Sequence, residues 1–344
     1  MTRLRVGLAG AGWVMEARHI PALRRCADVE IVALYDRQAT RAELLARRTG
    51  LTGARVYSDL DEFVGAGLDV VSVATSPWSH HDIAIAALAH GAHVFTEKPM
   101  AMNVPEARAM LAAAASAGRV LCVCHNFRFS RSARRADEIL AGDTVRYVGG
   151  LQLSSHRRRL PVWYRELPGG LLFDEMPHLL YMTNHLLGGG LRLGHGHGTV
   201  GPDGHPAITE LQLVGQRGEG QITMVFDSPV SEWHLMVVAD QRIVVLDLFR
   251  DILLELRSDH SHRALDIARS SGSLVADHLA GFLSTGVRLA RRRQFWGHDE
   301  ILRLFIEAAR GRAPVPVSAE EALSVVVTAS EIVGALQLRP ANQG

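Results

Sequence analysis

The sequence has few cysteines, little net charge and no long hydrophobic run. Its three cysteines, Cys26, Cys122 and Cys124, form no Cys-x-x-Cys pair, so we expect a reduced protein without disulfides or a structural zinc. A formal net charge of +1 argues against nucleic acid or a membrane surface as the main partner. The apolar runs, such as residues 69–75, have the length of strands, and residues 1–5 show no signal-peptide core. We therefore expect a cytoplasmic protein that binds no metal.

The length and rhythm of the chain predict two domains. Its 344 residues exceed the roughly 250–300 at which single cores stop growing. Over residues 1–125, short β-branched strands alternate with helical segments, which is typical of a doubly wound parallel (Rossmann) sheet in an α/β domain. The expected strands are 4–9, 30–35, 70–74, 93–95 and 120–123, and the clearest helices are 79–90 and 104–117.

Residues 126–344 follow a different pattern and predict an α+β domain with a mostly antiparallel sheet. The expected strands are 144–154, 208–214, 221–226, 232–238 and 241–246. A helix is expected at about 174–187. A second, at 273–293, is amphipathic, with Leu274, His278, Phe282 and Leu289 on one side. A capping box formed by Ser318 and Glu321 opens a terminal helix, 318–336, which we expect near the first domain.

A glycine-rich loop follows the first expected strand. Gly10 permits a tight turn, and Gly12 lets the backbone approach a pyrophosphate at the N-terminus of the helix that Trp13 and Val14 open. Met15 replaces the third glycine of the usual fingerprint. The loop by itself is a weak indication of a dinucleotide site.

An acid at the end of the second expected strand strengthens that interpretation. Asp36 lies about twenty residues beyond the loop, where a carboxylate binds the adenosine ribose hydroxyls. It would repel a 2′-phosphate, so we expect NAD in preference to NADP. Arg37 could stack on adenine or contact such a phosphate, and a helix cap is the alternative role of Asp36.

Glu97-Lys98-Pro99 follows a short apolar strand. The tripeptide places a lysine and a carboxylate at the carboxyl edge of the predicted sheet, where ligands bind in open α/β sheets. A lysine is costly to hold there unless it has a partner or a function. The alternative is a surface lysine before a helix-starting proline.

Asp174 and His178 form the second candidate pair. Four residues apart, they lie on one face of a helix that we expect to begin near Phe173 or Asp174, with Pro177 in its first turn. A histidine beside a carboxylate suits general acid–base chemistry. The alternative is an N-cap followed by a core histidine. There is no evident third metal ligand, and His195 and His197 read as a turn or strand edge.

Together these motifs resemble the Gfo/Idh/MocA oxidoreductases, the family of glucose–fructose oxidoreductase and inositol dehydrogenase. Glu-Lys-Pro combined with the downstream Asp-x-x-x-His is the most specific part. The matching segments, in the family's order, are Gly10–Gly12, His19–Leu23, Asp36, Thr75–His80, Glu97–Pro99, Asn126–Phe129, Gly169–His178 and Pro316–Ser318.

The resemblance implies a catalytic set of Lys98, Asp174 and His178. His178 would exchange a proton with the substrate as hydride moves to or from nicotinamide, Lys98 would hold the developing alkoxide, and Asp174 would orient the sugar or the imidazole. The resemblance also assigns residues around the ligands. Thr75, Pro77 and Glu97 would line the nicotinamide ribose with His80 close by. Arg128 and Trp163 are candidates for substrate contacts, with an interface element as the alternative for the stretch around Trp163.

The resemblance further implies a hydride-transfer enzyme that self-associates. We expect an NAD(P)-dependent dehydrogenase or reductase acting on a sugar, cyclitol or sugar-derived ketone. Imine reduction and an internally redox-neutral reaction remain alternatives on the same scaffold, as does a redox-silent NAD-binding regulator. The second domain would be an open sheet with helices on one face, through which a homodimer or homotetramer forms. The helix at 273–293 looks like an insertion.

Overall fold

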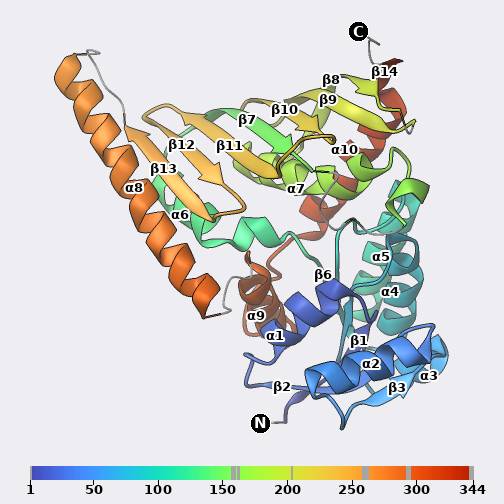
Figure 1. Ribbon diagram of the computed structural model, residues 1–344. Helices are drawn as coiled ribbons and strands as arrows, with labels where there is room; N and C mark the ends of the chain where they lie inside the picture. The colour runs from blue at the N-terminus through green and yellow to red at the C-terminus, as the bar shows by residue number, and fades with distance from the viewer. Residues whose placement is uncertain are drawn as a thin grey trace. The chain divides into compact units, whose positions relative to one another are not determined.

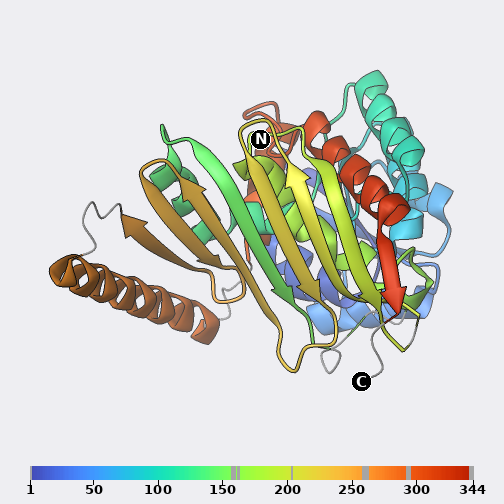
Figure 2. The ribbon, with the colours of Figure 1, turned by 90° about the horizontal axis from the view of Figure 1, so that it is seen from above.

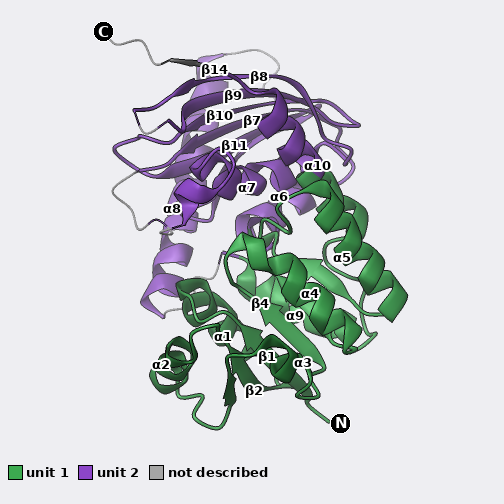
Figure 3. Ribbon diagram, turned by 90° about the vertical axis from the view of Figure 1, so that its right-hand side faces the viewer, with its two compact units in different colours: residues 1–126, 297–326 green, residues 127–296, 327–344 purple. Residues whose placement is uncertain are grey.

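The computed structural model describes residues 2–155, 160, 163–202, 204–257, 263–291 and 296–340. The chain forms two compact units (Figure 3). The first holds residues 1–126 and 297–326, and the second holds residues 127–296 and 327–344. No helix among the described residues is long and apolar enough to cross a membrane.

The first unit is built on a parallel six-stranded sheet in the order β3-β2-β1-β4-β5-β6, the Rossmann order that the sequence predicts. The chain changes direction between β1 and β4, so the crevice for ligands lies beyond the carboxyl ends of these strands. The strands are β1 (Leu4–Ala9), β2 (Val29–Tyr35), β3 (Arg55–Tyr57), β4 (Val70–Val73), β5 (His93–Thr96) and β6 (Leu121–Val123).

Helices flank this sheet. They are η1 (Met15–His19), α1 (Ile20–Leu23), α2 (Ala39–Thr49), α3 (Leu60–Val64), η2 (Pro77–Ser79), α4 (His80–Ala89), α5 (Val104–Ala117) and α9 (His298–Ala309). The sequence places α9 in the second domain, whereas the structure packs it against α1, η1 and β5 of the first unit. Its buried apolar face, which includes Ile301, Phe305 and Ile306, is completed only by these elements.

The second unit is built on an eight-stranded sheet in the order β13-β12-β11-β7-β10-β9-β8-β14. Only the pairs β7–β10 and β8–β14 are parallel, as expected for a mostly antiparallel sheet. The strands are β7 (Val145–Leu153), β8 (Arg192–Val200), β9 (Pro206–Val214), β10 (Glu219–Val225), β11 (Glu232–Ala239), β12 (Arg242–Asp247), β13 (Ile252–Arg257) and β14 (Gln337–Pro340).

Helices α6 (Arg131–Leu140) and α7 (Leu171–Leu186) lie against one face of this sheet (Figure 1). The strands alternate accordingly, and Ile222, Leu235 and Val237 are buried on the helical side. Leu151 and Met236 are exposed on the other side. The remaining elements are η3 (Asn126–Phe129), η4 (Tyr164–Glu166), α8 (Ala264–Ala290) and α10 (Ala319–Ala335), of which α10 begins in the first unit.

Two predictions about the second unit are wrong in detail. Of the two settings predicted for His195 and His197, a turn or a strand edge, the turn is wrong, since both residues lie inside β8. The alternating glycines of this segment hide a nine-residue strand from propensity arguments. Helix α8 begins at Ala264, nine residues before the predicted start. Leu274 is half-buried while Phe282 and Leu289 are exposed, so these side chains do not share one face.

Candidate active site

The glycine loop joins β1 to the first helix as predicted. Gly10 has φ of +101°, and a side chain there would meet the Ala74 carbonyl oxygen at 2.5 Å, so only glycine fits. At Gly12 a Cβ atom would lie 3.9 Å from the same oxygen, which is ordinary contact. The chain's own packing therefore does not require glycine at position 12, and the open space above it fits a pyrophosphate. Met15, in place of the third glycine, is fully buried.

Asp36 turns its carboxylate toward this loop. One oxygen accepts a hydrogen bond from the Ala11 amide at 3.0 Å, and the other accepts from the Gln38 amide at 3.0 Å. The contact with the Gln38 amide is a local turn, which is consistent with the alternative role of Asp36 as a helix cap. The contact with the Ala11 amide brings the carboxylate to the phosphate loop, the position from which a ribose diol is bound. Trp13 is nearly half exposed, with the Arg18 guanidinium 4.7 Å from its ring centre.

The ends of β4 and β5 are joined by a buried histidine. His80 places Nδ1 2.8 Å from the Pro99 carbonyl oxygen and Nε2 3.3 Å from the Thr75 carbonyl oxygen. Burial lowers the pKa of His80, while the two carbonyl contacts raise it. The sequence places His80 beside the cofactor. In the structure its ring contacts the two turns, Thr75–Pro77 and Glu97–Pro99, that are predicted to line the nicotinamide ribose.

Glu97 is buried beneath the strand end. Its carboxylate lies 2.9 Å from His19 Nε2 and 3.6 Å from His298 Nε2, and it accepts a 3.2 Å hydrogen bond from the Lys98 amide. Burial alone would raise the pKa of Glu97, but the contacts with His19 and His298 hold it well below its ordinary value. An ionised carboxylate thus fixes the backbone of the half-buried Lys98.

Helix α7 carries the other candidate pair. Gly169 and Gly170 have φ of +80° and +59°, and this turn starts the helix at Leu171. The prediction of a start near Phe173 or Asp174 is therefore wrong, and Pro177 lies in the second turn instead of the first. Asp174 is buried. At Gly170 a Cβ atom would meet the His205 ring at 2.8 Å. The positive φ and this close approach both require glycine at that position.

His178 lies in an aromatic surround and has a defined hydrogen-bond partner. The Phe127 amide donates to the Tyr181 hydroxyl oxygen at 3.1 Å, and that hydroxyl lies 2.9 Å from His178 Nδ1. Nδ1 is thus engaged by this hydroxyl, and which of the two groups donates depends on the tautomer of the imidazole. The rings of Phe127, Tyr181 and Trp233 stand 5.2, 5.7 and 5.1 Å from that of His178. Nε2 is therefore the atom through which His178 can exchange a proton.

A second buried carboxylate follows Asp174. Glu175 accepts hydrogen bonds from Gln152 at 2.7 Å and Ser154 at 2.6 Å, both on the strand side of α7. These contacts fix the rotation of α7 about its axis, and hence the face that Asp174 and His178 share. Glu175 is a positioning residue that the sequence analysis missed.

The remaining predicted substrate contacts lie in the second unit. Arg128 is half-buried, with its guanidinium 5.4 Å from the Phe129 ring centre. Trp163 is half-buried immediately before η4. In the same segment the Tyr164 hydroxyl accepts a hydrogen bond from Arg165 at 3.1 Å.

Two groups of described residues bring potential metal ligands within 4.8 Å of one another. The first is His19, Glu97 and Cys124 in the core of the first unit. Burial raises the pKa of the Cys124 thiol well above its ordinary value, so thiolate ligation is disfavoured there. The second is Glu232, His234 and Asp247, whose carboxylates are occupied by Arg250 (2.6 Å to each).

Sequence reasoning missed the partners of the predicted residues. His298, which faces Glu97, is separated from it by about 200 residues and carries no local signal. Tyr181 does have a local signal, since it is three residues from His178 and thus on the same helix face. Trp233 comes from β11 and reaches His178 only through the tertiary fold.

Comparisons with known proteins agree with this architecture. Residues 4–125 match the family model GFO_IDH_MocA, described as an oxidoreductase family with an NAD-binding Rossmann fold. D-glucoside 3-dehydrogenase of Escherichia coli is 32% identical over 192 residues, which is 54% of each chain. Myo-inositol 2-dehydrogenase of Thermotoga maritima is 26% identical over 187 residues, 54% of this chain and 55% of that protein. The chain thus spans about half the length of the curated relatives that it matches.

The fold is similar over nearly the whole chain to a solved structure. The WlbA dehydrogenase of Bordetella pertussis, in complex with NADH and UDP-GlcNAcA, superposes with a TM-score of 0.77. It covers 95% of this chain and 94% of its own, with 20% sequence identity. The Rossmann domain, the open mixed sheet and the matching family model agree with the motifs found in the sequence. Residues 4–125 of this chain thus match the Gfo/Idh/MocA oxidoreductase family model, and the chain as a whole has the fold of a solved dehydrogenase.

Proposed function

We propose that this protein is an NAD(P)-dependent dehydrogenase or reductase. It would transfer hydride between nicotinamide and a hydroxyl-bearing or carbonyl carbon of a sugar, cyclitol or sugar-derived ketone. The observation that carries the proposal is the carboxyl edge of the first sheet, where Gly12, Asp36 and Lys98 follow three strands of one Rossmann sheet. The curated relatives that match act, by their names, on a glucoside and on an inositol, both polyhydroxylated.

The first unit fits a dinucleotide. The space above Gly12 and the helix that starts there suit a pyrophosphate, and the Asp36 carboxylate at the loop suits the adenosine ribose. The Thr75–Pro77 turn and Lys98 would lie at the nicotinamide ribose, held by His80 and Glu97. When bound, the dinucleotide supplies the hydride acceptor or donor.

The chain's own groups would move the proton. In the oxidation direction, His178 would hold its own proton on Nδ1, toward the Tyr181 hydroxyl oxygen, and accept the substrate hydroxyl proton on Nε2. In the reduction direction it returns a proton to the carbonyl oxygen. Lys98 would stabilise negative charge on that oxygen, and Asp174 would orient a substrate hydroxyl or the imidazole. Arg128 and Trp163 are proposed to contact the rest of the substrate.

We also propose that NAD is preferred over NADP, because Asp36 repels a 2′-phosphate. Asp36→Ala is expected to weaken the binding of NAD about tenfold or more, because a charge-assisted hydrogen bond is lost. The binding of NADP should weaken less. Titration of tryptophan fluorescence with each dinucleotide measures both constants. The exposed Asp61→Ala is the matched control. Equal losses for the two dinucleotides would count against the ribose contact.

The proposal includes self-association through the open face of the second sheet and a cytoplasmic location. Leu151, Ile208 and Met236 are exposed on strands of that sheet, which is unusual for strand residues that face water. The proposed location rests on the sequence, whose three cysteines form no Cys-x-x-Cys pair.

The experiment that tests the activity is a screen of sugars, cyclitols and keto-sugars with each dinucleotide, followed by nicotinamide absorbance. We expect turnover with a polyhydroxylated substrate. Binding of NAD without turnover of any of them, in either direction, would favour a redox-silent regulator.

A further inference from the structure

Helix α8 lies along the β13 edge of the second unit's sheet (Figure 2), where Arg131 of α6 also hydrogen-bonds its Ser284. It has 27 residues, Ala264–Ala290, and therefore a length of about 40 Å. Its two faces are reversed relative to an ordinary surface helix. Polar and small side chains meet its own sheet, and large apolar side chains face away from it.

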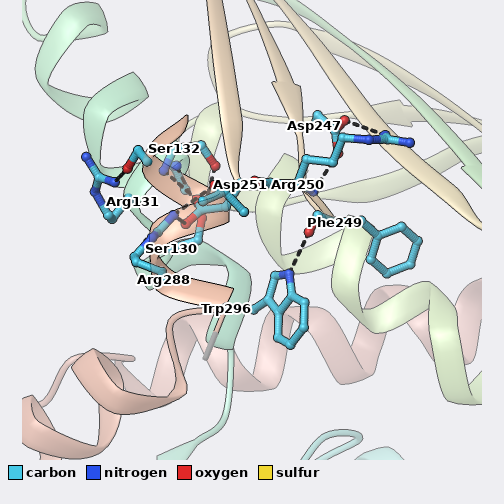
Figure 4. A network of polar contacts seen from close by, with 12 residues as sticks. Ser130, Arg131, Ser132, Asp247, Phe249, Arg250, Asp251, Arg288 and Trp296 are labelled. Carbon is cyan, nitrogen blue, oxygen red and sulfur yellow. Dashed lines mark hydrogen bonds and ion pairs between the residues drawn. The ribbon is translucent and has the colours of Figure 1, made fainter. Parts of the chain in front are cut away.

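The inner face is held by polar contacts (Figure 4). Asp277 accepts a hydrogen bond from the Glu255 amide on β13 at 3.2 Å. The Thr285 hydroxyl donates to the Arg250 carbonyl oxygen at 2.7 Å, and Arg288 pairs with Asp251 at 2.8 Å.

Two further contacts fix the helix close to the sheet. Asp251 also accepts from the Ser132 amide at the start of α6 at 2.8 Å, which ties α8, the β12–β13 turn and α6 together. Gly281 allows close approach, because a Cβ atom there would come within 2.8 Å of Ile252. The orientation of α8 about its own axis is therefore set by several specific contacts.

The outer face follows a heptad pattern. Residues three and four apart in strict alternation form one stripe along the entire helix, and all of them are exposed. They are Leu265, Ala268, Gly272, Val275, Leu279, Phe282, Gly286 and Leu289. Such a 3–4 repeat is the sequence requirement for pairing with another helix at close range. The half-buried residues Leu274, Asp277 and Gly281 lie on the opposite side.

The stripe exposes a large apolar surface. Five of its large apolar side chains are at least half exposed, with Leu265 at 71% and Phe282 at 60%. Leu283, which is 64% exposed, and Ile267 and Val287, each 50% exposed, flank the stripe. With these flanking side chains included, two copies together would bury on the order of 1,000 Å², which is what a biological interface needs.

We propose that the outer face of α8 pairs with α8 of a second copy of this chain, antiparallel about a two-fold axis. Between Arg269 and Arg288 the stripe carries no charged residue, so a charged peptide, a nucleic acid or an anionic headgroup finds no complementary group on it. A neutral apolar stripe is self-complementary, as a two-fold interface requires.

The order of large and small residues fixes the register. With the axis between positions 275 and 279, Val275 of one copy faces Leu279 of the partner subunit, and Gly272 faces Phe282 of the partner subunit. The outermost layers then pair Ala268 with the small Gly286, and Leu265 with Leu289. At Gly272 and Gly286 nothing of the same chain lies within 4 Å of a Cβ position, which leaves room for the facing side chain.

Sedimentation velocity of the full chain tests the proposal. Leu279→Glu places a charge at the centre of the stripe and is expected to halve the mass of the assembly, raising its dissociation constant about a hundredfold or more. Ser273→Glu, an exposed position off the stripe, is expected to keep the wild-type mass. Circular dichroism confirms that both variants fold.

Two results would overturn the proposal. One is a wild-type chain that sediments at its monomer mass of 37.5 kDa. A monomer that floats with phosphatidylcholine vesicles would overturn the proposal in the same way. The other is a Leu279→Glu variant with the wild-type mass, which would leave the sheet face as the contact between copies.

Cross-linking tests the register. The double variant Leu265→Cys, Leu289→Cys is expected to give a covalent dimer under mild oxidation, seen by mass on a non-reducing gel. Neither single variant is expected to give more dimer than the wild-type chain, because each of these positions would face itself only in a parallel pair. A single variant that cross-links as well as the double variant would contradict the antiparallel arrangement.

Discussion

The two units hold their predicted catalytic side chains in different ways. In the first unit an ionised carboxylate, Glu97, is clamped by two histidines and fixes the backbone of Lys98. In the second, a hydroxyl and aromatic rings surround His178, and the buried Glu175 accepts hydrogen bonds from an amide and a hydroxyl. Lys98 thus depends on a charge network that responds to pH, whereas His178 depends on packing and on one tyrosine hydroxyl.

The largest expected effect concerns the two side chains themselves. Lys98→Ala or His178→Ala is expected to lower kcat by roughly 10²–10⁴-fold, the range for a positioned acid–base group. The dissociation constant for NAD should change little. Steady-state kinetics and fluorescence titration measure the two effects. The exposed His90→Ala is the control, and full activity of either variant would dismiss that residue's role.

The charge network of the first unit predicts a pH-dependent stability. The pKa of Glu97 lies well below its ordinary value of 4.5 in the folded state. Its ionised form therefore contributes stability that is present above that value and is lost as the pH falls below it. We expect Glu97→Gln to lower the free energy of unfolding by about 2–3 kcal/mol near neutral pH.

Urea unfolding at several pH values measures this prediction. The difference between wild type and Glu97→Gln should shrink as the pH falls below 4.5. Glu62→Gln, at an exposed position of the same unit, should show no such trend. A difference that is constant with pH would mean that Glu97 is not ionised in the folded protein.

The neutral network of the second unit predicts a smaller, catalytic effect. Tyr181→Phe removes the hydroxyl that bonds His178 Nδ1, so the imidazole loses the hydrogen bond that would hold its proton on Nδ1. We expect kcat to fall about tenfold, corresponding to the loss of one hydrogen bond, with NAD affinity unchanged. Tyr147→Phe, whose hydroxyl reaches Gln221 at 3.4 Å near the surface, is the control. Unchanged kinetics in Tyr181→Phe would show that packing alone orients His178.

The smallest stability effect is expected at Gly12. Gly12→Ala should fold with near wild-type stability, since its Cβ atom would meet only the Ala74 oxygen at 3.9 Å, but it should weaken NAD binding. Gly10→Ala should instead destabilise the fold, because of its positive φ and the 2.5 Å approach. Thermal unfolding measures the stability of each variant, and titration with NAD measures its affinity for the dinucleotide. A stable Gly12→Ala variant with full NAD affinity would place the pyrophosphate elsewhere.

Local sequence predicted much of the first unit because its signals are local. Helix α5 was predicted at its exact bounds, since Asn103 caps its start and Gly118 ends it in the left-handed conformation. The glycine loop and Asp36 follow the fingerprint spacing. The three-residue strand β3 was missed because it begins with the exposed Arg55 and buries only Tyr57, whereas the equally short β6 is apolar and fully buried.

The second unit was less predictable because its elements depend on distant contacts. Two glycines with positive φ move the start of α7, and glycines inside β8 conceal that strand. The partners of Glu97 and His178 come from elements far apart in sequence, so no spacing rule finds His298 or Trp233. Patterns place a catalytic side chain on its element, whereas the groups that orient it are set by the tertiary fold.

The central claim is that Lys98 and His178 serve one reaction centre. A crystal structure of the protein with NAD and a substrate identified in the screen tests it most directly. We predict Lys98 Nζ and His178 Nε2 within hydrogen-bond distance of the same substrate oxygen, beside nicotinamide C4. Two side chains that point into separate cavities around the bound dinucleotide would contradict the account.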